Sequence, residues 1–115
     1  MLELKDFEAA YNKVQEVVLP TKLIKSDYFS DQTGNDVYLK PENMQLTGAY
    51  KIRGAYYKIS TLSEEEKAKG LITASAGNHA QGVAYAAKLA GIPATIVMPT
   101  TTPLMKVNHL STVKG

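Results

Sequence analysis

Lys51 lies in the segment TGAYKIRGA, residues 47–55, and its surroundings predict an activated amine. It follows a small-residue turn and stands in the first turn of a predicted helix, between Tyr50 and Ile52. The N-terminal end of a helix disfavours a positive charge, and burial beside these two neighbours would further favour the neutral amine. A neutral lysine is a nucleophile that condenses with aldehydes, and pyridoxal phosphate is the aldehyde cofactor of amino-acid chemistry. The alternative is a lysine that extends its ammonium into water from an amphipathic helix.

The segment SAGNHAQG, from Ser75 to Gly82, is the second candidate for chemistry. Its glycine-containing turn leads into a predicted helix, whose first N–H groups have no acceptor within the helix. Together with the side chains of Ser75 and Asn78, these donors predict a site for an anion such as a carboxylate or a phosphate. The segment matches neither the G-x-G-x-x-G dinucleotide motif nor the phosphate loop that ends in G-K-[ST]. The alternative is that Ser75 and Asn78 only cap the helix.

Alternating helix and strand signals must position both segments. The sequence predicts helices over residues 4–20, 49–62, 63–70 and 79–91, and the opening of another over 102–110. It predicts strands over residues 37–40 and 92–99, and over residues 71–78 a strand that runs into a glycine-containing turn. Residues 26–36 are predicted as a polar stretch with a turn at Gly34 and Asn35. In the first helix the apolar residues at helical spacing are Phe7, Ala10, Tyr11, Val14, Val17 and Val18. This order predicts an α/β fold with an open parallel sheet and flanking helices, in which ligands bind at the carboxyl ends of the strands.

The composition excludes several classes of protein. The net charge is only +2 and the basic residues form no cluster, so no nucleic-acid partner is predicted. The absence of cysteine excludes disulfides and thiolate metal sites and fits a cytoplasmic protein. His109 is a lone histidine without a partner at ligand spacing, so no metal site is predicted. The N-terminus has no signal-peptide pattern and no apolar stretch is long enough to span a bilayer, so no membrane partner is predicted.

Three segments of the chain closely resemble consecutive segments of a known enzyme family. They are KPENMQLTGAYKIRGA (residues 40–55), TASAGNHAQGVA (73–84) and IVMPTTTPLMKV (96–107). The family is that of the fold-type II pyridoxal-phosphate enzymes, whose fold is tryptophan synthase β-like, and the segments resemble those of its threonine dehydratase (threonine ammonia-lyase) branch. The order and spacing of the segments agree with the family, and the resemblance extends from about Thr21 onward.

The resemblance implies a role for each matched residue. Lys51 would form the internal aldimine with pyridoxal 5'-phosphate and return as the catalytic base at the substrate α-carbon. Tyr50 takes the position of an aromatic residue, more often phenylalanine, that flanks the cofactor, and Asn78 would hydrogen-bond the cofactor's ring hydroxyl. The loop that holds the substrate carboxylate would be formed by Ser75, Gly77, Asn78 and His79.

The same resemblance implies the deamination of L-threonine, and of L-serine, to a 2-oxo acid and ammonia. Lys51 would remove the α-proton and the β-hydroxyl would leave as water. Threonine would give 2-oxobutanoate, and a biosynthetic role that feeds isoleucine is preferred over a catabolic one. A serine racemase or dehydratase relative is the alternative. Such racemases usually carry a second serine where this chain has Ala76, which cannot carry a proton, so elimination is favoured.

The resemblance also predicts the domain organisation. Residues 1–50 would be a lead-in that belongs to the large domain, and residues 51–115 would be part of the small α/β domain. The sequence contains neither the glycine-rich loop for the cofactor phosphate nor the partner of the pyridine nitrogen, so we expect an N-terminal fragment without the rest of the catalytic region. The full-length protein is expected to be a homo-oligomer that acts on a small-molecule amino acid. The alternative is a non-catalytic truncated fragment, or an interaction module that keeps the fold.

Overall fold

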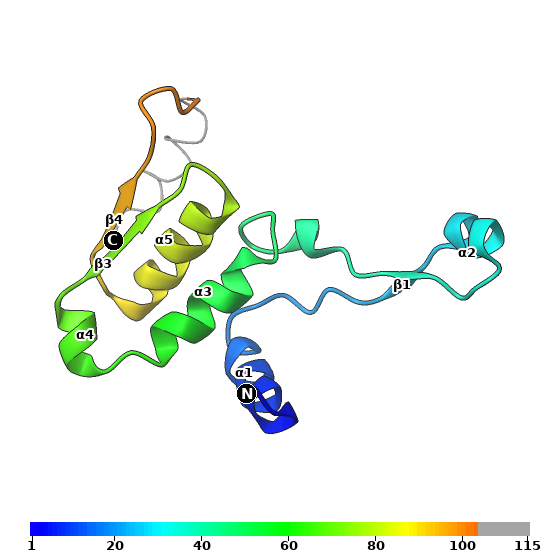
Figure 1. Ribbon diagram of the computed structural model, residues 1–115, viewed down its shortest axis with the longest axis horizontal. Helices are drawn as coiled ribbons and strands as arrows, with labels where there is room; N and C mark the ends of the chain where they lie inside the picture. Colours follow the sequence, from blue (N-terminus) through cyan, green and yellow to red (C-terminus); the bar gives the residue numbers. More distant parts are fainter. Residues whose placement is uncertain (104–115) are drawn as a thin grey trace.

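The computed structural model describes residues 1–103, and Figure 1 shows the arrangement of its elements. The helices are α1 (Leu4–Val14), α2 (Asp27–Thr33), α3 (Lys51–Ser60), α4 (Glu64–Ala68) and α5 (Asn78–Ala90), with the 3-10 helix η1 (Glu42–Met44). The strands are β1 (Ile24–Lys25), β2 (Tyr38–Leu39), β3 (Leu71–Ala74) and β4 (Ala94–Val97). No helix in this described part is long and apolar enough to cross a membrane. Apart from its first two positions, the helix predicted over residues 102–110 lies outside the described residues, as does His109.

Strands β3 and β4 form a parallel pair that carries the core. Leu71 is paired with Ala94 and Ala74 with Val97, and α5 connects the two strands. Helix α5 packs against both strands, and α3 packs along α5, as Figure 1 shows. The buried cluster between these elements consists of Ile52, Ala55, Ile59, Val83, Ala86 and Ile92. The predicted α/β fold with a parallel sheet and flanking helices is therefore confirmed.

Local hydrogen bonds determine where the helices around this sheet begin and end. At the start of α4 the Ser63 side chain accepts from the Glu66 N–H (3.2 Å), and the Glu66 carboxylate accepts from the Ser63 N–H (2.8 Å). This is the capping box that the sequence predicts. Helix α5 ends at Gly91, whose φ of 66° is the left-handed conformation that glycine adopts without strain.

The segment predicted as a polar stretch contains the helix α2, so that prediction is wrong. The Ser26 side chain accepts from the Phe29 N–H (3.3 Å) at the start of α2, and Gly34 ends the helix with a φ of 66°. A capping serine and a terminal glycine are helix signals that outweigh the polar composition here. The turn at Gly34 is confirmed. The predicted strand over residues 37–40 is confirmed as β2, which pairs antiparallel with β1, a strand that the sequence pattern does not predict.

Helix α1 is shorter than predicted, and half of its apolar face is exposed. It ends at Val14, which is buried, while Phe7 and Tyr11 are 59% and 61% exposed. After the helix the chain turns, and Val17 and Val18 pack against the core cluster. The N-terminal segment therefore contacts the core cluster through Val17 and Val18, while the described residues leave Phe7 and Tyr11 uncovered.

Candidate active site

Lys51 is the first residue of α3, so its predicted place in the first turn of a helix is confirmed. The preceding Tyr50 has helical dihedral angles (φ −64°, ψ −13°), and no described side chain caps the helix. Lys51 is partly buried, and its Nζ lies 5.1 Å from the centre of the Tyr50 ring. Tyr50 is 59% exposed, whereas Ile52 is fully buried. The burial predicted for the amine is therefore only partial, because one of its two neighbours faces outward.

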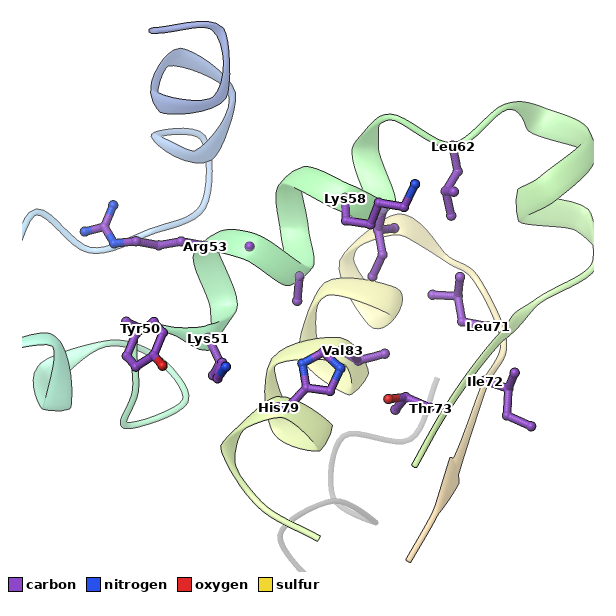
Figure 2. Close-up of a pocket in the computed structure, with 13 residues that line it drawn as sticks. Tyr50, Lys51, Arg53, Lys58, Leu62, Leu71, Ile72, Thr73, His79 and Val83 are labelled. Carbon is purple, nitrogen blue, oxygen red and sulfur yellow. The ribbon is translucent and has the colours of Figure 1, made fainter. Parts of the chain in front are cut away.

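A pocket of about 560 Å³ lies beside Lys51, between α3, β3 and α5. Figure 2 shows Lys51 and His79 at this pocket, Lys51 from the start of α3 and His79 from the start of α5. The other lining residues are Tyr50, Arg53, Gly54, Ala55, Lys58, Ile59, Leu62, Leu71, Ile72, Thr73 and Val83. Its wall is mainly apolar, with basic side chains and no carboxylate among the lining residues that the structure describes. Such a pocket suits a ligand with an apolar body and an anionic group.

The loop between β3 and α5 has the donors that the sequence predicts, but its serine does not cap the helix. The Ser75 hydroxyl accepts from the Gly77 N–H (3.2 Å), and the Ser75 N–H donates to the carbonyl of Val97 (2.9 Å). Gly77 is the N-cap of α5, which starts at Asn78 without a side-chain cap among the described residues. The N–H groups of the first turn therefore face outward without an acceptor in the helix.

Some of the predicted site residues share the pocket and others border the loop. Tyr50, Lys51 and His79 line the pocket, while Ser75, Gly77 and Asn78 lie in the adjoining loop and are not part of its lining. Asn78 and His79 are exposed, and Ser75 and Gly77 are partly buried. An amine, an apolar wall and a helix N-terminus are thus close together. The predicted chemistry requires an amine for the cofactor's aldehyde, an apolar wall for its aromatic ring, and N–H donors for the substrate carboxylate.

Gly82 lies against the backbone of Lys51, a contact that sequence reasoning missed. A Cβ added at Gly82 would lie 3.1 Å from both the carbonyl carbon and the carbonyl oxygen of Lys51, and 3.3 Å from the nitrogen of Ile52. These atoms are backbone atoms, which cannot move aside as a flexible side chain can. The missing Cβ therefore lets α5 approach the turn that carries the amine. The available signal is an isolated glycine inside a helical pattern, which usually has a packing reason.

A second feature that sequence reasoning missed is the carboxylate of Glu42, which accepts three hydrogen bonds. Arg53 donates to it twice, from Nε to Oε2 and from Nη2 to Oε1, at 2.8 Å each. The Thr21 hydroxyl donates to Oε1 at 2.6 Å. These hydrogen bonds, those from the guanidinium above all, lower the pKa of Glu42 from 4.5 to about 2. No local spacing in the sequence indicates this network, because its three members come from separate segments.

The stability that Glu42 contributes is expected to disappear in acid. The folded pKa of about 2 lies below the ordinary 4.5, so the contribution is present above about pH 4.5 and is lost as the pH falls through the folded pKa. At about 1.4 kcal/mol per pH unit between these values, it amounts to about 3 kcal/mol near neutral pH. Urea unfolding at about pH 6 and about pH 3 should show the free-energy gap between wild type and Glu42→Gln shrinking by about 2 kcal/mol.

Glu65→Gln is the matched control for this measurement, because it makes the same change in an exposed ion pair with Lys69 (3.0 Å). Exposed pairs contribute little, so the gap for this variant should stay near zero at both pH values. A gap for Glu42→Gln that does not change with pH would contradict the assignment of a depressed pKa to Glu42.

Comparison with known families places most of the chain in one of them. The sequence model of the family described as "Pyridoxal-phosphate dependent enzyme" matches residues 14–113. The matched range includes Lys51, the loop from Ser75 to His79, and Gly82. Both segments singled out in the sequence therefore fall inside the match.

Curated relatives and a solved structure are similar to most of this chain. The L-threonine ammonia-lyase of Thermotoga maritima is 55% identical over 107 residues, which are 93% of this chain and 27% of the relative. A catabolic L-threonine dehydratase of Staphylococcus aureus (strain N315) is 57% identical over 109 residues, which are 94% of this chain and 32% of the relative. The structure of maize serine racemase aligns with a TM-score of 0.90 at 38% identity, over 98% of this chain and 34% of that one. The chain thus spans about a third or less of the length of these proteins.

Proposed function

This chain belongs to the family of pyridoxal-phosphate dependent enzymes, and from that membership we propose that it is part of an enzyme that deaminates L-threonine, with L-serine as a second substrate, to a 2-oxo acid and ammonia. The observation that carries the proposal is the Lys51 amine, which shares a pocket with His79 beside the start of α5, where no described side chain caps the helix. The two relatives named for threonine deamination, 55% and 57% identical to this chain, support the choice of substrate.

The residues of this chain fit the family's cofactor at three points. Pyridoxal phosphate supplies, when bound, an electron sink for the electron pair left on the substrate α-carbon. Lys51 Nζ is the amine that would bind its aldehyde carbon, and the Tyr50 ring would flank it. Asn78 carries a side-chain amide that would donate a hydrogen bond to its ring hydroxyl.

The loop from Ser75 to His79 would orient the substrate through its carboxylate. The N–H groups at the start of α5 carry partial positive charge and have no acceptor within the helix, so they favour an anion. We assign to Lys51 Nζ, freed when the substrate's amino group takes its place, the removal of the proton from the α-carbon. The β-hydroxyl leaves with this proton as water, and a second water then replaces the amino group, which gives the 2-oxo acid and ammonia. His79 is assigned to the carboxylate loop, since an amine at Lys51 already serves as the base.

We further propose that residues 1–50 belong to the large domain of the whole enzyme and residues 51–115 to its small domain. The lead-in exposes large apolar side chains that the described residues do not cover, and Figure 1 shows the hairpin around α2 extending away from the α3–α5 core. These side chains, between 44% and 69% exposed, are Leu23, Ile24, Tyr28, Phe29, Tyr38 and Leu39. The family resemblance supports a cytoplasmic homo-oligomer for the whole enzyme.

Racemisation of serine is the second candidate, because the maize serine racemase aligns with this chain over nearly its whole length. Racemisation requires a proton donor on the face of the α-carbon opposite to the base. Ala76 directly follows Ser75 in the loop and carries no such proton. We therefore favour elimination, and D-serine formation at a rate comparable to ammonia release would reverse this preference.

Borohydride reduction in the presence of pyridoxal phosphate tests the proposal. The purified protein is mixed with pyridoxal phosphate, reduced and digested, and the pyridoxyl-labelled peptide is located by mass spectrometry. We expect selective labelling of Lys51 among the twelve lysines of the sequence, and loss of that signal in Lys51→Ala. Labelling spread over the surface lysines would argue instead for the non-catalytic fragment.

A further inference from the structure

The Glu42–Arg53 ion pair is the least exposed pair among the described residues. The side chains of Glu42 and Arg53 are 17% and 29% exposed. In every other ion pair of residues 1–103 at least one partner is more than half exposed. Arg53 is the single arginine of the sequence, and its planar guanidinium binds both oxygens of the carboxylate. Two parallel hydrogen bonds fix the relative orientation of the two side chains as well as the distance between them, and a lysine ammonium cannot fix that orientation.

This pair closes the loop that leads into Lys51. Glu42 begins η1, and Arg53 lies two residues after Lys51 in the first turn of α3. Between them the chain passes through Gly48, whose φ is 68°, and reaches a helix start that no described side chain caps. The carboxylate therefore ties the first turn of α3 to the segment that precedes the loop.

The lead-in chain holds the other side of the same loop. The Gln45 side chain, in a residue only 4% exposed, accepts from the Leu19 N–H (3.1 Å) and donates to the Leu19 carbonyl (2.8 Å). Thr21 donates to Glu42, and the Lys40 ammonium donates to the Thr21 carbonyl. These hydrogen bonds hold the segment that contains Glu42 against residues 19–21. The ion pair with Arg53 therefore connects α3 to a segment that is itself held in place.

Arg53 and Lys51 use different sides of the same helical turn. Successive residues of a helix are about 100° apart, so residues two apart project in nearly opposite directions. Figure 2 shows Arg53 extending away from His79, while Lys51 lies on the side of His79. A contact that holds the Arg53 side of the turn therefore sets the rotation of α3, and with it the position of the Lys51 amine.

We propose that Glu42 and Arg53 are positioning residues, which fix the first turn of α3 and thereby hold Lys51 Nζ at the pocket. This inference rests on the proposed function in that Lys51 is the group with a chemical role. Arg53 borders the pocket, but its guanidinium is bound to Glu42 and extends away from His79, so in this assignment the ion pair contacts neither substrate nor cofactor. Its effect is on where the amine lies and how often the turn that carries it opens.

The test measures Lys51 directly in the purified protein, without cofactor. Wild type, Glu42→Gln, Arg53→Gln and Arg53→Lys are acetylated with a limiting amine-reactive ester, and the labelling of Lys51 is read by mass spectrometry relative to the exposed Lys88. Amide hydrogen exchange is followed in residues 50–54. Glu65→Gln, which opens the exposed pair with Lys69, is the matched control.

We expect the labelling of Lys51 relative to Lys88 to rise about threefold or more in Glu42→Gln and Arg53→Gln, because a partly buried amine becomes accessible when the turn opens. Exchange in residues 50–54 should become about tenfold faster in the same variants. Arg53→Lys, which keeps the charge but loses the second hydrogen bond, should be intermediate, and Glu65→Gln should match wild type.

Two results would overturn the inference. One is that Glu42→Gln and Arg53→Gln leave the labelling of Lys51 and the hydrogen exchange of residues 50–54 unchanged, even if they lower the stability of the protein. The other is an equal rise at Lys51 and Lys88, which would mean general unfolding. Should both glutamine variants fail to fold, Arg53→Lys gives the same two readouts. Neither readout needs pyridoxal phosphate, so failure of the borohydride experiment would remove the proposed function and leave this result standing.

Discussion

Lys51→Arg is expected to lower the rate of 2-oxobutanoate formation from L-threonine by about 10³- to 10⁴-fold in the complete enzyme. Arginine keeps the length and the positive charge of the side chain, so the first turn of α3 and the contact with the Tyr50 ring should survive. Its guanidinium does not lose a proton at any pH that the protein tolerates, so it is neither a nucleophile nor a base. The measurement is the steady-state rate of 2-oxobutanoate formation at saturating threonine.

Two further variants separate a missing amine from a damaged fold. Lys88→Arg makes the same change on the exposed last turn of α5 and should leave the rate unchanged. Lys51→Ala should regain part of its activity when a small primary amine is added, because the pocket beside α3 has room for one. A Lys51→Arg variant that keeps more than about a tenth of the wild-type rate would remove Lys51 from the role of the base, given the general-base contribution of about a hundredfold or more.

The sequence is most informative where a local pattern is sufficient to determine the structure. The apolar periodicity and terminal glycine of α5, the run that forms β3 and the capping box before α4 each act within a few residues, and all three appear where they are predicted. The parallel pairing of β3 with β4 follows from the helix between them. Helix α2 was predictable in the same way, since Ser26 and Gly34 mark its ends, but its polar composition obscured these signals.

Contacts between distant segments account for what could not be predicted. The place of Lys51 in a helical turn follows from its neighbours, but its partial exposure depends on the direction in which Tyr50 points. The partners of Glu42 are separated from it along the chain by 21 residues for Thr21 and 11 for Arg53, so no periodicity reveals them. Likewise, Phe7 and Tyr11 have the spacing of buried residues and are exposed. The spacing shows that α1 has an apolar face, but burial also requires another part of the protein to cover that face.

Gly82→Val is expected to destabilise the protein by about 3 kcal/mol and to displace Lys51. The added Cβ would lie 3.1 Å from the carbonyl carbon and oxygen of Lys51, and the two methyl groups of valine enlarge the overlap. Relief requires α3 to move away from α5, which opens the tightly packed contact where Ile52 is fully buried. Urea unfolding measures the loss of stability, and the labelling of Lys51 relative to Lys88 measures the displacement.

The control for this variant is Gly54→Val, because Gly54 lies in α3 and a Cβ added there meets nothing within 4 Å. Valine is a somewhat better helix former than glycine, so this control should be unchanged or slightly more stable. The stability of Gly82→Ala should lie between those of Gly82→Val and Gly54→Val. Alanine gains about 1 kcal/mol of helix propensity over glycine, and its single methyl group overlaps Lys51 less than valine does. If Gly82→Val were as stable as Gly54→Val and left the labelling of Lys51 unchanged, the close approach of α5 would not be what holds the lysine in place. The Glu42–Arg53 pair would then be the remaining contact that we propose to hold the amine, which makes the two sets of variants a joint test of how this helix start is held.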